Sequence, residues 1–501
     1  MSKRVIALIL GVLCLTGSVF SLMACVDRTS GNEHEDTAAP EKDPLDKLAG
    51  LDFGGADVNF IIAGADGDSY NTRSICIEDT ESSDPVDIEI MKRNQQIERG
   101  LNVHINLVDD REDSITAQIK TQLDAGTNKY DVIGALQYDD IQLALSGDMI
   151  DINGLAAYNA DYINWRNEYW ATSYIEALSF GTKVYWLAGD ICLRYMGGYY
   201  AFFVNSDIYR AKLFDEYGDI YDIVDRGEWT YDLLMQMIPL CFVDVNGNKR
   251  ADLNGDTVGL ALPCWDNING MSVSAGVVYT GYDTDGMPYC TVNTGNTTLI
   301  NFMNKCCELF KTDGVYDFGS DYRAAMNCFA SGKAAFISGR LNQAELYLGN
   351  MKANYYVLPC PKLDAQQSSY YTAVHDAINI YGINIGSDHY GASAAVLEEM
   401  AYLSCVNVRP VYFENALAKT YKRGSRADDV IRMMHDTVYT DFVFVWQFSD
   451  RFADDKGGIE LGLYLRNSVK QKNAAASIRK NQTRWAAAVD KIVEEIKELE
   501  D

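Results

Sequence analysis

The chain has 501 residues, of which 48% are hydrophobic, and its 71 acidic residues outnumber its 43 basic ones. This size and composition argue against global disorder and suffice for two large lobes or about three to four small domains. The formal net charge of −28 excludes the overall basic surface that nucleic-acid binding requires, and it disfavours anionic ligands unless a local basic pocket exists.

The first 24 residues have the pattern of a secretory signal peptide. The pair Lys3-Arg4 is followed by the nearly uniform apolar run 5–15. Leu22-Met-Ala-Cys25 comes next and resembles the bacterial lipobox, which implies that Cys25 is acylated and becomes the first mature residue. We therefore predict removal of residues 1–24 and a lipid anchor on Cys25. An uncleaved membrane anchor is the alternative, because the apolar segment is almost long enough to span a bilayer.

Residues 25–50 predict a lipidated cysteine followed by a flexible tether, since the segment is rich in polar residues. Of the 12 cysteines, Cys14 and Cys25 lie in the N-terminal segment, which leaves ten. Their spacings contain no CxxC pair and no zinc pattern. Export permits disulfides, so both buried thiols and one or two bridges remain open.

The first third of the mature chain alternates predicted strands with predicted helices. Apolar runs predict strands at 57–63, 103–108 and 130–136. Amphipathic segments at 88–99 and 114–123 predict the intervening helices. Strands and helices in this alternation predict a doubly wound α/β lobe with a parallel sheet.

Polar residues follow two of these strands. Tyr138, Asp139 and Asp140 come after the third strand and before a short helical segment at 141–145, and the loop 64–70 follows the first strand. Ligands of parallel sheets bind at the carboxyl ends of the strands, so both places predict ligand contacts. The alternative for the first group is that it only starts the helix, with an Asp as N-cap.

The stretch 129–155, with its YDVI and SGDMIDINGL segments, resembles the extracellular solute-binding proteins of ABC importers, in particular the sugar-binding family. Five further segments resemble the family in the family's own order: 183–190, 199–205, 227–234, 329–336 and 358–362. The shared order, spread from about residue 57 to 450, carries the resemblance more than any one segment does.

The resemblance implies a two-lobed α/β fold of the periplasmic-binding-protein type II kind, with two doubly wound sheets joined by crossing hinge strands and followed by C-terminal helices. Each lobe would be discontinuous: lobe one, 51–196 plus 377–434, and lobe two, 197–376 plus 435–501. Crossings are expected near 197–198, 375–376 and 436–446. The apolar face of residues 478–499 predicts a long helix that packs on lobe two.

The resemblance also implies a function. The chain would capture a carbohydrate, in particular an oligosaccharide, and deliver it to ABC permease subunits as a monomer anchored outside the cytoplasmic membrane of a Gram-positive-type bacterium. We predict no enzyme activity and no cofactor, because HExxH, GxSxG, P-loop and GxGxxG motifs are missing from the sequence. The acidic net charge predicts that nucleic acid is no partner. A secreted carbohydrate-active enzyme with a carboxylate pair, a surface adhesin lipoprotein, and capture of a peptide or other polar solute remain alternatives.

For the cleft, the sequence predicts aromatic and polar side chains in loops at strand ends or crossings. Aromatic faces stack on sugar rings, and carboxylate, amide and guanidinium groups pair with hydroxyls. The predicted ligand-binding residues are Tyr70, Tyr138, Asp139, Trp265, Asp266, Asn267, Arg340, Asp376 and Trp446.

One polar loop resembles fragments of a calcium site. Asp244, Asn246 and Asn248 place side-chain oxygens at alternating positions, as suits a hard cation, and Asp252 begins a second fragment of the same kind. An EF-hand loop needs glycine at its sixth position, where Lys249 stands. We therefore predict no metal site and retain the four residues only as calcium candidates beside an ordinary turn.

Overall fold

The computed structural model describes residues 45–64, 70–111, 114–417, 423–447, 449, 452–454, 457–458, 461–471 and 474–500. The predicted signal peptide, Cys25 and residues 26–44 of the tether lie outside these residues. The end of the predicted tether, 45–50, is described, and Leu48 in it is buried. Within the described part, no helix combines the length and the apolarity that a membrane crossing needs. The ten cysteines that it contains are free thiols.

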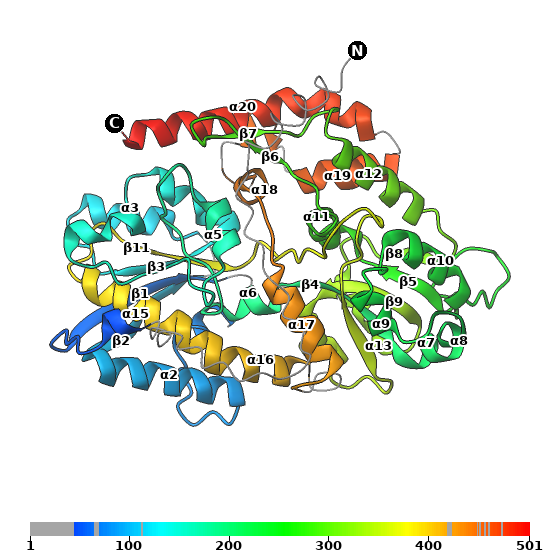
Figure 1. Ribbon diagram of the computed structural model, residues 1–501, viewed down its shortest axis with the longest axis horizontal. Helices are drawn as coiled ribbons and strands as arrows, with labels where there is room; N and C mark the ends of the chain where they lie inside the picture. Colours follow the sequence, from blue (N-terminus) through cyan, green and yellow to red (C-terminus); the bar gives the residue numbers. More distant parts are fainter. Residues whose placement is uncertain are drawn as a thin grey trace, which may run out of the picture. The chain divides into compact units, whose positions relative to one another are not determined.

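Four strands form the first sheet, in the order β11 (Asn379–Ile383), β3 (Val132–Leu136), β1 (Ala56–Ala63) and β2 (Val103–Arg111) (Figure 1). The three predicted strands are confirmed, and β1 is parallel to both of its neighbours. β11 joins from much later in the chain and is antiparallel to β3. Every residue of β3 is buried, as expected for a short apolar strand that is covered on both faces.

Five strands form the second sheet, in the order β10 (Tyr355–Pro359), β4 (Tyr200–Asn205), β9 (Ala334–Arg340), β5 (Val258–Leu262) and β8 (Val315–Asp317). β5 is parallel to both β8 and β9, whereas β4 is antiparallel to β9 and β10. The carboxyl ends of β5 and β9 therefore lie at the edge where β4 begins.

The helices that precede β4 are η1 (Asp46–Leu48), α1 (Tyr70–Arg73), α2 (Pro85–Leu101), α3 (Thr116–Asp124), α4 (Gln137–Asp140), η2 (Ile141–Leu145), η3 (Ile152–Tyr158), α5 (Thr172–Leu178) and α6 (Leu193–Gly197). Both predicted helices of this region are confirmed, with longer bounds for α2. Its first turn is capped by Asp84, which accepts a hydrogen bond from the Val86 backbone. It ends at Asn102, whose φ of 51° is the left-handed conformation of a C-cap.

The second sheet carries the helices α7 (Ser206–Lys212), α8 (Phe214–Tyr217), α9 (Ile220–Asp225), α10 (Tyr231–Cys241), α11 (Cys264–Ser274), α12 (Thr297–Leu309), α13 (Tyr322–Ala330) and α14 (Leu341–Leu348). A hairpin of β6 (Thr280–Tyr282) and β7 (Pro288–Cys290) lies between α11 and α12 in the chain. Thr230 caps α10 by accepting from the Leu233 backbone, so the helix begins at Tyr231.

The chain passes from the first sheet to the second between β3 and β4 and returns between β10 and β11. At the predicted crossings the segments run side by side, because Tyr199 pairs with Val374 and Thr372 pairs with Val438. After β11 come α15 (Tyr390–Leu403), η4 (Ser404–Val408), α16 (Arg409–Ala416), α17 (Arg426–Asp436), α18 (Phe442–Trp446), β12 (Ala453–Asp454), β13 (Gly457–Gly458), α19 (Leu461–Gln471) and α20 (Ala474–Glu500). α15 packs on α2 of the first sheet, whereas α17 packs on β10 of the second.

The last helix, α20, has the predicted amphipathic character. Its apolar face is buried at Ile478, Trp485, Val489, Ile492 and Ile496. It packs on α12, α19 and β7, and also on η2, which follows β3 of the first sheet (Figure 1, red). The helix thus packs on elements of the predicted lobe two, and it also contacts η2 of the predicted lobe one.

Candidate functional site

The carboxyl-terminal edge of the second sheet gathers several polar and aromatic residues. Trp265 is the second residue of α11, which follows β5 closely, and Arg340 is the last residue of β9. Arg340 pairs with Tyr200, the first residue of the antiparallel strand β4. α11 crosses the start of β4 so closely that a Cβ on Gly270 would lie 2.3 Å from the Tyr200 ring. These contacts show that α11, the end of β9 and the start of β4 lie together at one edge of the second sheet.

The crossing segment around His375 and the helix α6 also lie at this edge, and α6 contacts elements that belong with each of the two sheets. His375 donates its backbone N–H to the Gly198 carbonyl at 3.0 Å, and its ring centroid lies 6.0 Å from that of Tyr200. Arg194 of α6 donates from Nη1 to the Ala377 carbonyl at 2.9 Å. α6 packs on α1, which follows β1, and on α14 of the second sheet.

A cavity of about 90 Å³ lies at this junction. Its walls come from α6, the end of β9, the first turn of α13, the first two turns of α14, and the crossing segment. The lining residues are Arg194, Gly198, Tyr322, Arg340, Asn342, Gln343, Leu346, His375 and Ala377. Parts of the chain that lie far apart in the sequence thus converge on one polar cavity.

His375 is neutral in this cavity. Burial lowers its pKa well below the usual value, and the positive charges of Arg340 and Arg194 lower the pKa further. The Ala377 backbone donates to Nδ1 at 3.0 Å, so the proton of the neutral ring is on Nε2. The 3.2 Å approach of Nδ1 to the Asp376 carboxylate is therefore a contact between two acceptors and no ion pair.

At the carboxyl end of β3, neighbouring acids have different surroundings. Tyr138 and Asp139 are half-buried, whereas Asp140 is fully buried. The Asp140 carboxylate accepts from the hydroxyls of Ser114 and Thr116 and from the backbone of Ile115 and Thr116. Asp140 thus caps α3, a helix from earlier in the chain, and its side chain makes no cap hydrogen bond to η2, the helical segment that follows it, where the sequence analysis expected an Asp cap.

Replacing Asp140 by alanine is expected to lower the free energy of unfolding by about 1–2 kcal/mol, because the start of α3 loses its cap. The matched variant Asp124→Ala, at the exposed other end of α3, is expected to stay within about 0.5 kcal/mol of the unsubstituted protein. Urea unfolding of both variants measures the difference. Equal losses would show that the cap contributes nothing specific.

Two predicted ligand residues are placed in the interior. Asn267 is 2% exposed and donates from Nδ2 to the Ser338 carbonyl at 3.0 Å, so it fastens α11 to β9. Trp446 is fully buried, and its ring centroid lies 5.5 Å from that of Phe442 and 5.8 Å from that of Phe180. Because these side chains face the core, we do not retain them in the proposed site.

The other predicted residues fall into different groups. Trp265 is 48% exposed and has the Arg466 guanidinium over its ring. Arg340 lines the cavity, and Asp376 adjoins it. Tyr70 opens α1 and Asp266 lies in α11, but their side chains lie outside the described part of the structure.

Of the two arginines that line the cavity, the sequence analysis predicted Arg340 as a ligand residue but not Arg194. Arg194 is the lone charged residue of the apolar run 191–203, which was a usable signal. His375 adjoins the predicted Asp376, but its position against two guanidinium groups depends on contacts between distant segments.

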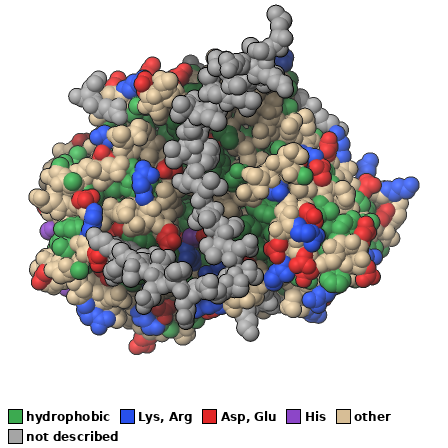
Figure 2. Space-filling view, viewed as in Figure 1, with side chains coloured by type: hydrophobic (Ala, Val, Ile, Leu, Met, Phe, Trp, Pro, Cys, Tyr) green, Lys and Arg blue, Asp and Glu red, His purple; other side chains and the backbone are tan. Residues whose placement is uncertain are grey.

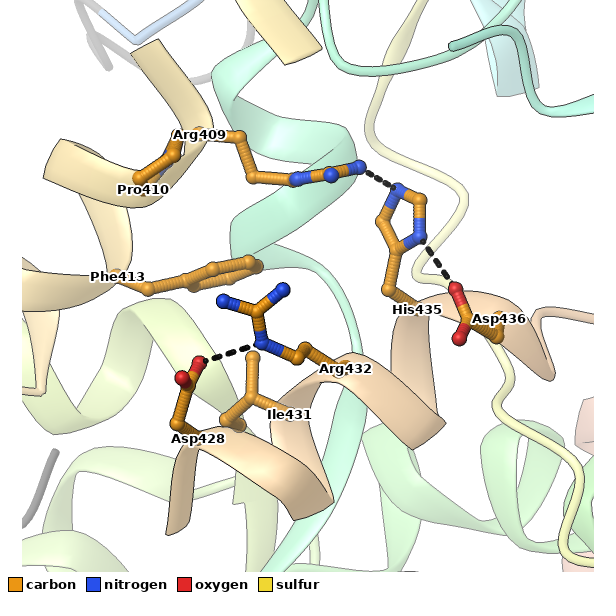
Figure 3. Close-up of a pocket in the computed structure, with 8 residues that line it drawn as sticks. All are labelled: Arg409, Pro410, Phe413, Asp428, Ile431, Arg432, His435 and Asp436. Atoms are coloured by element: carbon orange, nitrogen blue, oxygen red, sulfur yellow. Dashed lines mark hydrogen bonds and ion pairs between the residues drawn. The ribbon is translucent and has the colours of Figure 1, made fainter. Parts of the chain in front are cut away.

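A second cavity, of about 130 Å³, lies between α16 and α17 (Figure 3). Its lining residues are Arg409, Pro410, Phe413, Asp428, Ile431, Arg432, His435 and Asp436. The charged groups pair with one another: Arg432 Nε donates to Asp428 at 3.1 Å, and His435 Nδ1 lies 3.3 Å from Asp436. Phe413 and Ile431 supply apolar surface.

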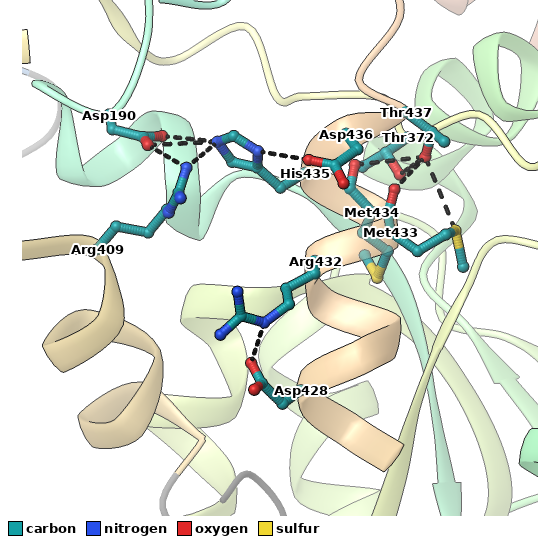
Figure 4. A network of polar contacts seen from close by, with 10 residues as sticks. All are labelled: Asp190, Thr372, Arg409, Asp428, Arg432, Met433, Met434, His435, Asp436 and Thr437. Atoms are coloured by element: carbon teal, nitrogen blue, oxygen red, sulfur yellow. Dashed lines mark hydrogen bonds and ion pairs between the residues drawn. The ribbon is translucent and has the colours of Figure 1, made fainter. Parts of the chain in front are cut away.

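Behind this cavity lies a buried ion network centred on Asp190 (Figure 4). Asp190 is 1% exposed and accepts from Arg409 Nη1 at 2.7 Å and from His435 Nε2 at 3.1 Å. Burial would lower the pKa of His435, but the Asp190 carboxylate outweighs burial and the nearby Arg409 charge and raises the pKa to about 9. Burial would likewise raise the pKa of Asp190, but its two cations hold that pKa below its usual value. The network joins the segment before α6 to α16 and α17, so its role is structural.

The calcium candidates form a hydrogen-bonded turn. Asp244 accepts from the backbones of Gly247 at 2.7 Å and Lys249 at 2.8 Å, and Asp252 accepts from the amides of Asn246 and Asn248. Among the described residues, no group of three or more His, Cys, Asp or Glu side chains could hold a metal ion. The carboxylate oxygens thus serve the turn.

Comparison with known proteins finds solved structures of similar fold. No protein-family model and no curated protein matches the sequence. Solved structures similar to the chain include a sugar transporter from Rhizobium etli in an open conformation (12% identity, 87% of this chain and 99% of that one, TM-score 0.54) and apo RafE from Streptococcus pneumoniae (12%, 87% and 98%, 0.53). UgpB from Mycobacterium tuberculosis, solved in complex with glycerophosphocholine, is similar as well (14%, 88% and 100%, 0.52). The chain therefore has the two-lobed, periplasmic-binding-protein-like α/β fold that these structures share, as its sequence predicts.

Proposed function

We propose that the chain is a lipid-anchored extracellular protein that captures a carbohydrate, in particular an oligosaccharide, between its lobes and delivers it to an ABC permease. The observation that carries this proposal is the convergence of α6, β9, α14 and the crossing segment on one polar cavity. The fold supports it, as does the likeness to a sugar transporter. The leader pattern that ends in Cys25 supports the anchor.

The mechanism is differential affinity between an open and a closed state. A ligand that contacts both lobes favours the closed state by the free energy of the contacts that only this state makes. The crossing segments near 197–198, 375–376 and 436–446 would act as the hinge. The two lobes would have the boundaries that the sequence predicts. The bound solute leaves unaltered, since this role needs no bond to be made or broken.

The proposed contacts combine an aromatic face with hydrogen-bonding groups. Stacking on rings and charge-assisted hydrogen bonds to hydroxyls together bind sugars. The proposed ligand contacts are Tyr70, Tyr138, Asp139, Arg194, Trp265, Asp266, Arg340, His375 and Asp376.

The proposed partners are the solute, the permease subunits and, through Cys25, the membrane. The acidic net charge of −28 argues against nucleic acid. On the face seen in Figure 2, the Lys and Arg side chains are scattered among Asp and Glu side chains. The tether would hold a monomeric body away from the membrane surface.

A thermal-unfolding panel of neutral mono- and oligosaccharides tests the proposal on the mature chain. A sugar that occupies the site at a hundred times its dissociation constant is expected to stabilise the folded protein by about 2.7 kcal/mol. Oligosaccharides should produce the shift at lower concentrations than their component monosaccharides. A panel without any saturable shift would contradict carbohydrate capture.

A further inference from the structure

Two cavities lie on opposite sides of the crossing strand that leads into β4. Tyr199 and Tyr200 are consecutive residues of this extended segment, so their side chains point to opposite faces. The ring centroid of Tyr200 lies 6.0 Å from that of His375, which lines the cavity of about 90 Å³, the front cavity. The ring centroid of Tyr199 lies 6.4 Å from that of Phe413 and 6.3 Å from that of His435. Both of these residues line the cavity of about 130 Å³, the rear cavity, which therefore lies behind the proposed hinge.

The two walls of the rear cavity are helices that belong with different sheets (Figure 3). One wall is α16, which packs with α15 and η4 on α2, the helix beside β2, and which also contacts α14. The other wall is α17, which packs on β10 of the second sheet. Arg426 in the first turn of α17 also pairs with Asp222 at 2.9 Å and with Asp225 at 2.6 Å, both in α9. A rotation of one lobe against the other therefore moves one wall relative to the other.

The buried ion network ties the two walls together at the end nearest the crossing strand. Asp190 accepts hydrogen bonds from Arg409 at the start of α16 and from His435 near the end of α17 (Figure 4). Phe413 and Ile431 each lie four residues, about one helical turn, from this tie and give the cavity its apolar surface. The spacing between the walls can therefore change most at these two side chains.

On the proposed hinge, rotation changes the two cavities in opposite senses. The crossing strand lies between them, so lobes that approach each other at the front cavity separate at the rear cavity. A void in a protein interior costs free energy that grows with its volume, because the atoms of its walls lose contacts. The closed state therefore carries the larger cost at the rear cavity, and side chains that fill this cavity reduce the cost.

We propose that the rear cavity sets the balance between the open and the closed state, and thereby the affinity for the solute, through the side chains of α16 and α17 that fill it. This inference rests on the proposed function and adds a regulatory part to it. Ile431 is 1% exposed, lines the rear cavity and does not line the front cavity. It is a positioning residue, because it acts on the solute only through the movement of the lobes.

Paired substitutions of Ile431 test the inference on the mature chain, with maltotriose and cellotriose as probes. Ile431→Phe fills the rear cavity and should raise the affinity for a bound trisaccharide about 3- to 10-fold, because the closed state becomes more populated. Ile431→Ala enlarges the void and should lower the affinity by a similar factor. Calorimetric titration measures both affinities.

Small-angle X-ray scattering of the sugar-free protein gives a second readout that needs no ligand. The radius of gyration should be smaller in Ile431→Phe than in Ile431→Ala, because filling the rear cavity favours closed lobes. The matched control is Val430→Ala, a truncation of the neighbouring residue of α17, which is 4% exposed and does not line the rear cavity. This control should lose stability but keep the affinity and the radius of the unsubstituted protein.

The opposite signs of the two affinity changes separate a lever from a merely structural residue. A structural role would lower the unfolding midpoint of both Ile431 variants and leave the affinity and the radius of the folded protein unchanged. If a trisaccharide binds and both variants shift its affinity in the same direction or leave it unchanged, the inference is wrong and carbohydrate capture stands. If no sugar binds, the proposed function fails, whereas the order of the two radii still decides the inference.

Discussion

Asp190→Asn is expected to lower the free energy of unfolding by about 3–5 kcal/mol, because it leaves buried cations without their anion. Asp190 is 1% exposed, and its carboxylate lies 2.7 Å from Arg409 Nη1 and 3.1 Å from His435 Nε2. The asparagine amide keeps the shape but cannot balance the two charges. Chemical denaturation monitored by tryptophan fluorescence measures the loss.

Asp436→Asn is the matched control. Asp436 contacts the same histidine at 3.3 Å, but its side chain is 76% exposed, so its removal should cost at most about 1 kcal/mol. Comparable losses in the two variants would mean that burial of the network adds nothing, contrary to this account.

The same network gives stability a defined pH dependence. Because the folded-state pKa of His435 is raised to about 9 from an ordinary value of 6.5, its contribution is fully present below pH 6.5 and is lost as pH rises through 9. The unsubstituted protein should therefore become less stable between these values. Asp190→Asn should flatten this part of the profile, because the raised pKa depends on the carboxylate.

Trp446→Ala is expected to lower the free energy of unfolding by about 3–5 kcal/mol, as truncations of buried tryptophans do. The side chain is fully buried between Phe442 and Phe180, so it ties α18 to the segment that follows α5. The loss should be the same with and without a saturating ligand once the ligand's own stabilisation is subtracted.

Trp265→Ala provides the contrast. Trp265 is 48% exposed, so its truncation should change stability by less than about 1 kcal/mol and should weaken sugar binding instead. A Trp446→Ala variant of full stability that no longer binds sugar would contradict the core assignment and restore the ligand role that the sequence suggested.

The elements of the first sheet could be predicted from sequence because their signals are local. The apolar run that ends at Leu136 is a strand buried on every residue, and the amphipathic face of α20 is buried as its spacing predicts. The signal for the start of α10 was local as well, since Thr230 caps this helix. Local signals fix which elements form.

The partners of side chains could not be predicted in the same way, because they come from distant segments. Asp140 caps a helix from earlier in the chain, and α20 contacts η2, which lies far earlier in the sequence. The charges of Arg194 and Arg340 lower the pKa of His375 only because the folded chain brings the crossing segment next to α6 and the end of β9. The apolar neighbours of Trp446, residues 442–445, were a local signal that this side chain lies in the core. The prediction of a ligand role did not use that signal.

The most direct measurement of the central claim is equilibrium dialysis of the mature chain against neutral and acidic oligosaccharides, with the retained sugar identified by mass spectrometry. The account predicts saturable retention of one oligosaccharide per chain, recovered at its original mass. Recovery of shortened sugars would instead indicate a hydrolase, and retention of no carbohydrate at any concentration would contradict capture.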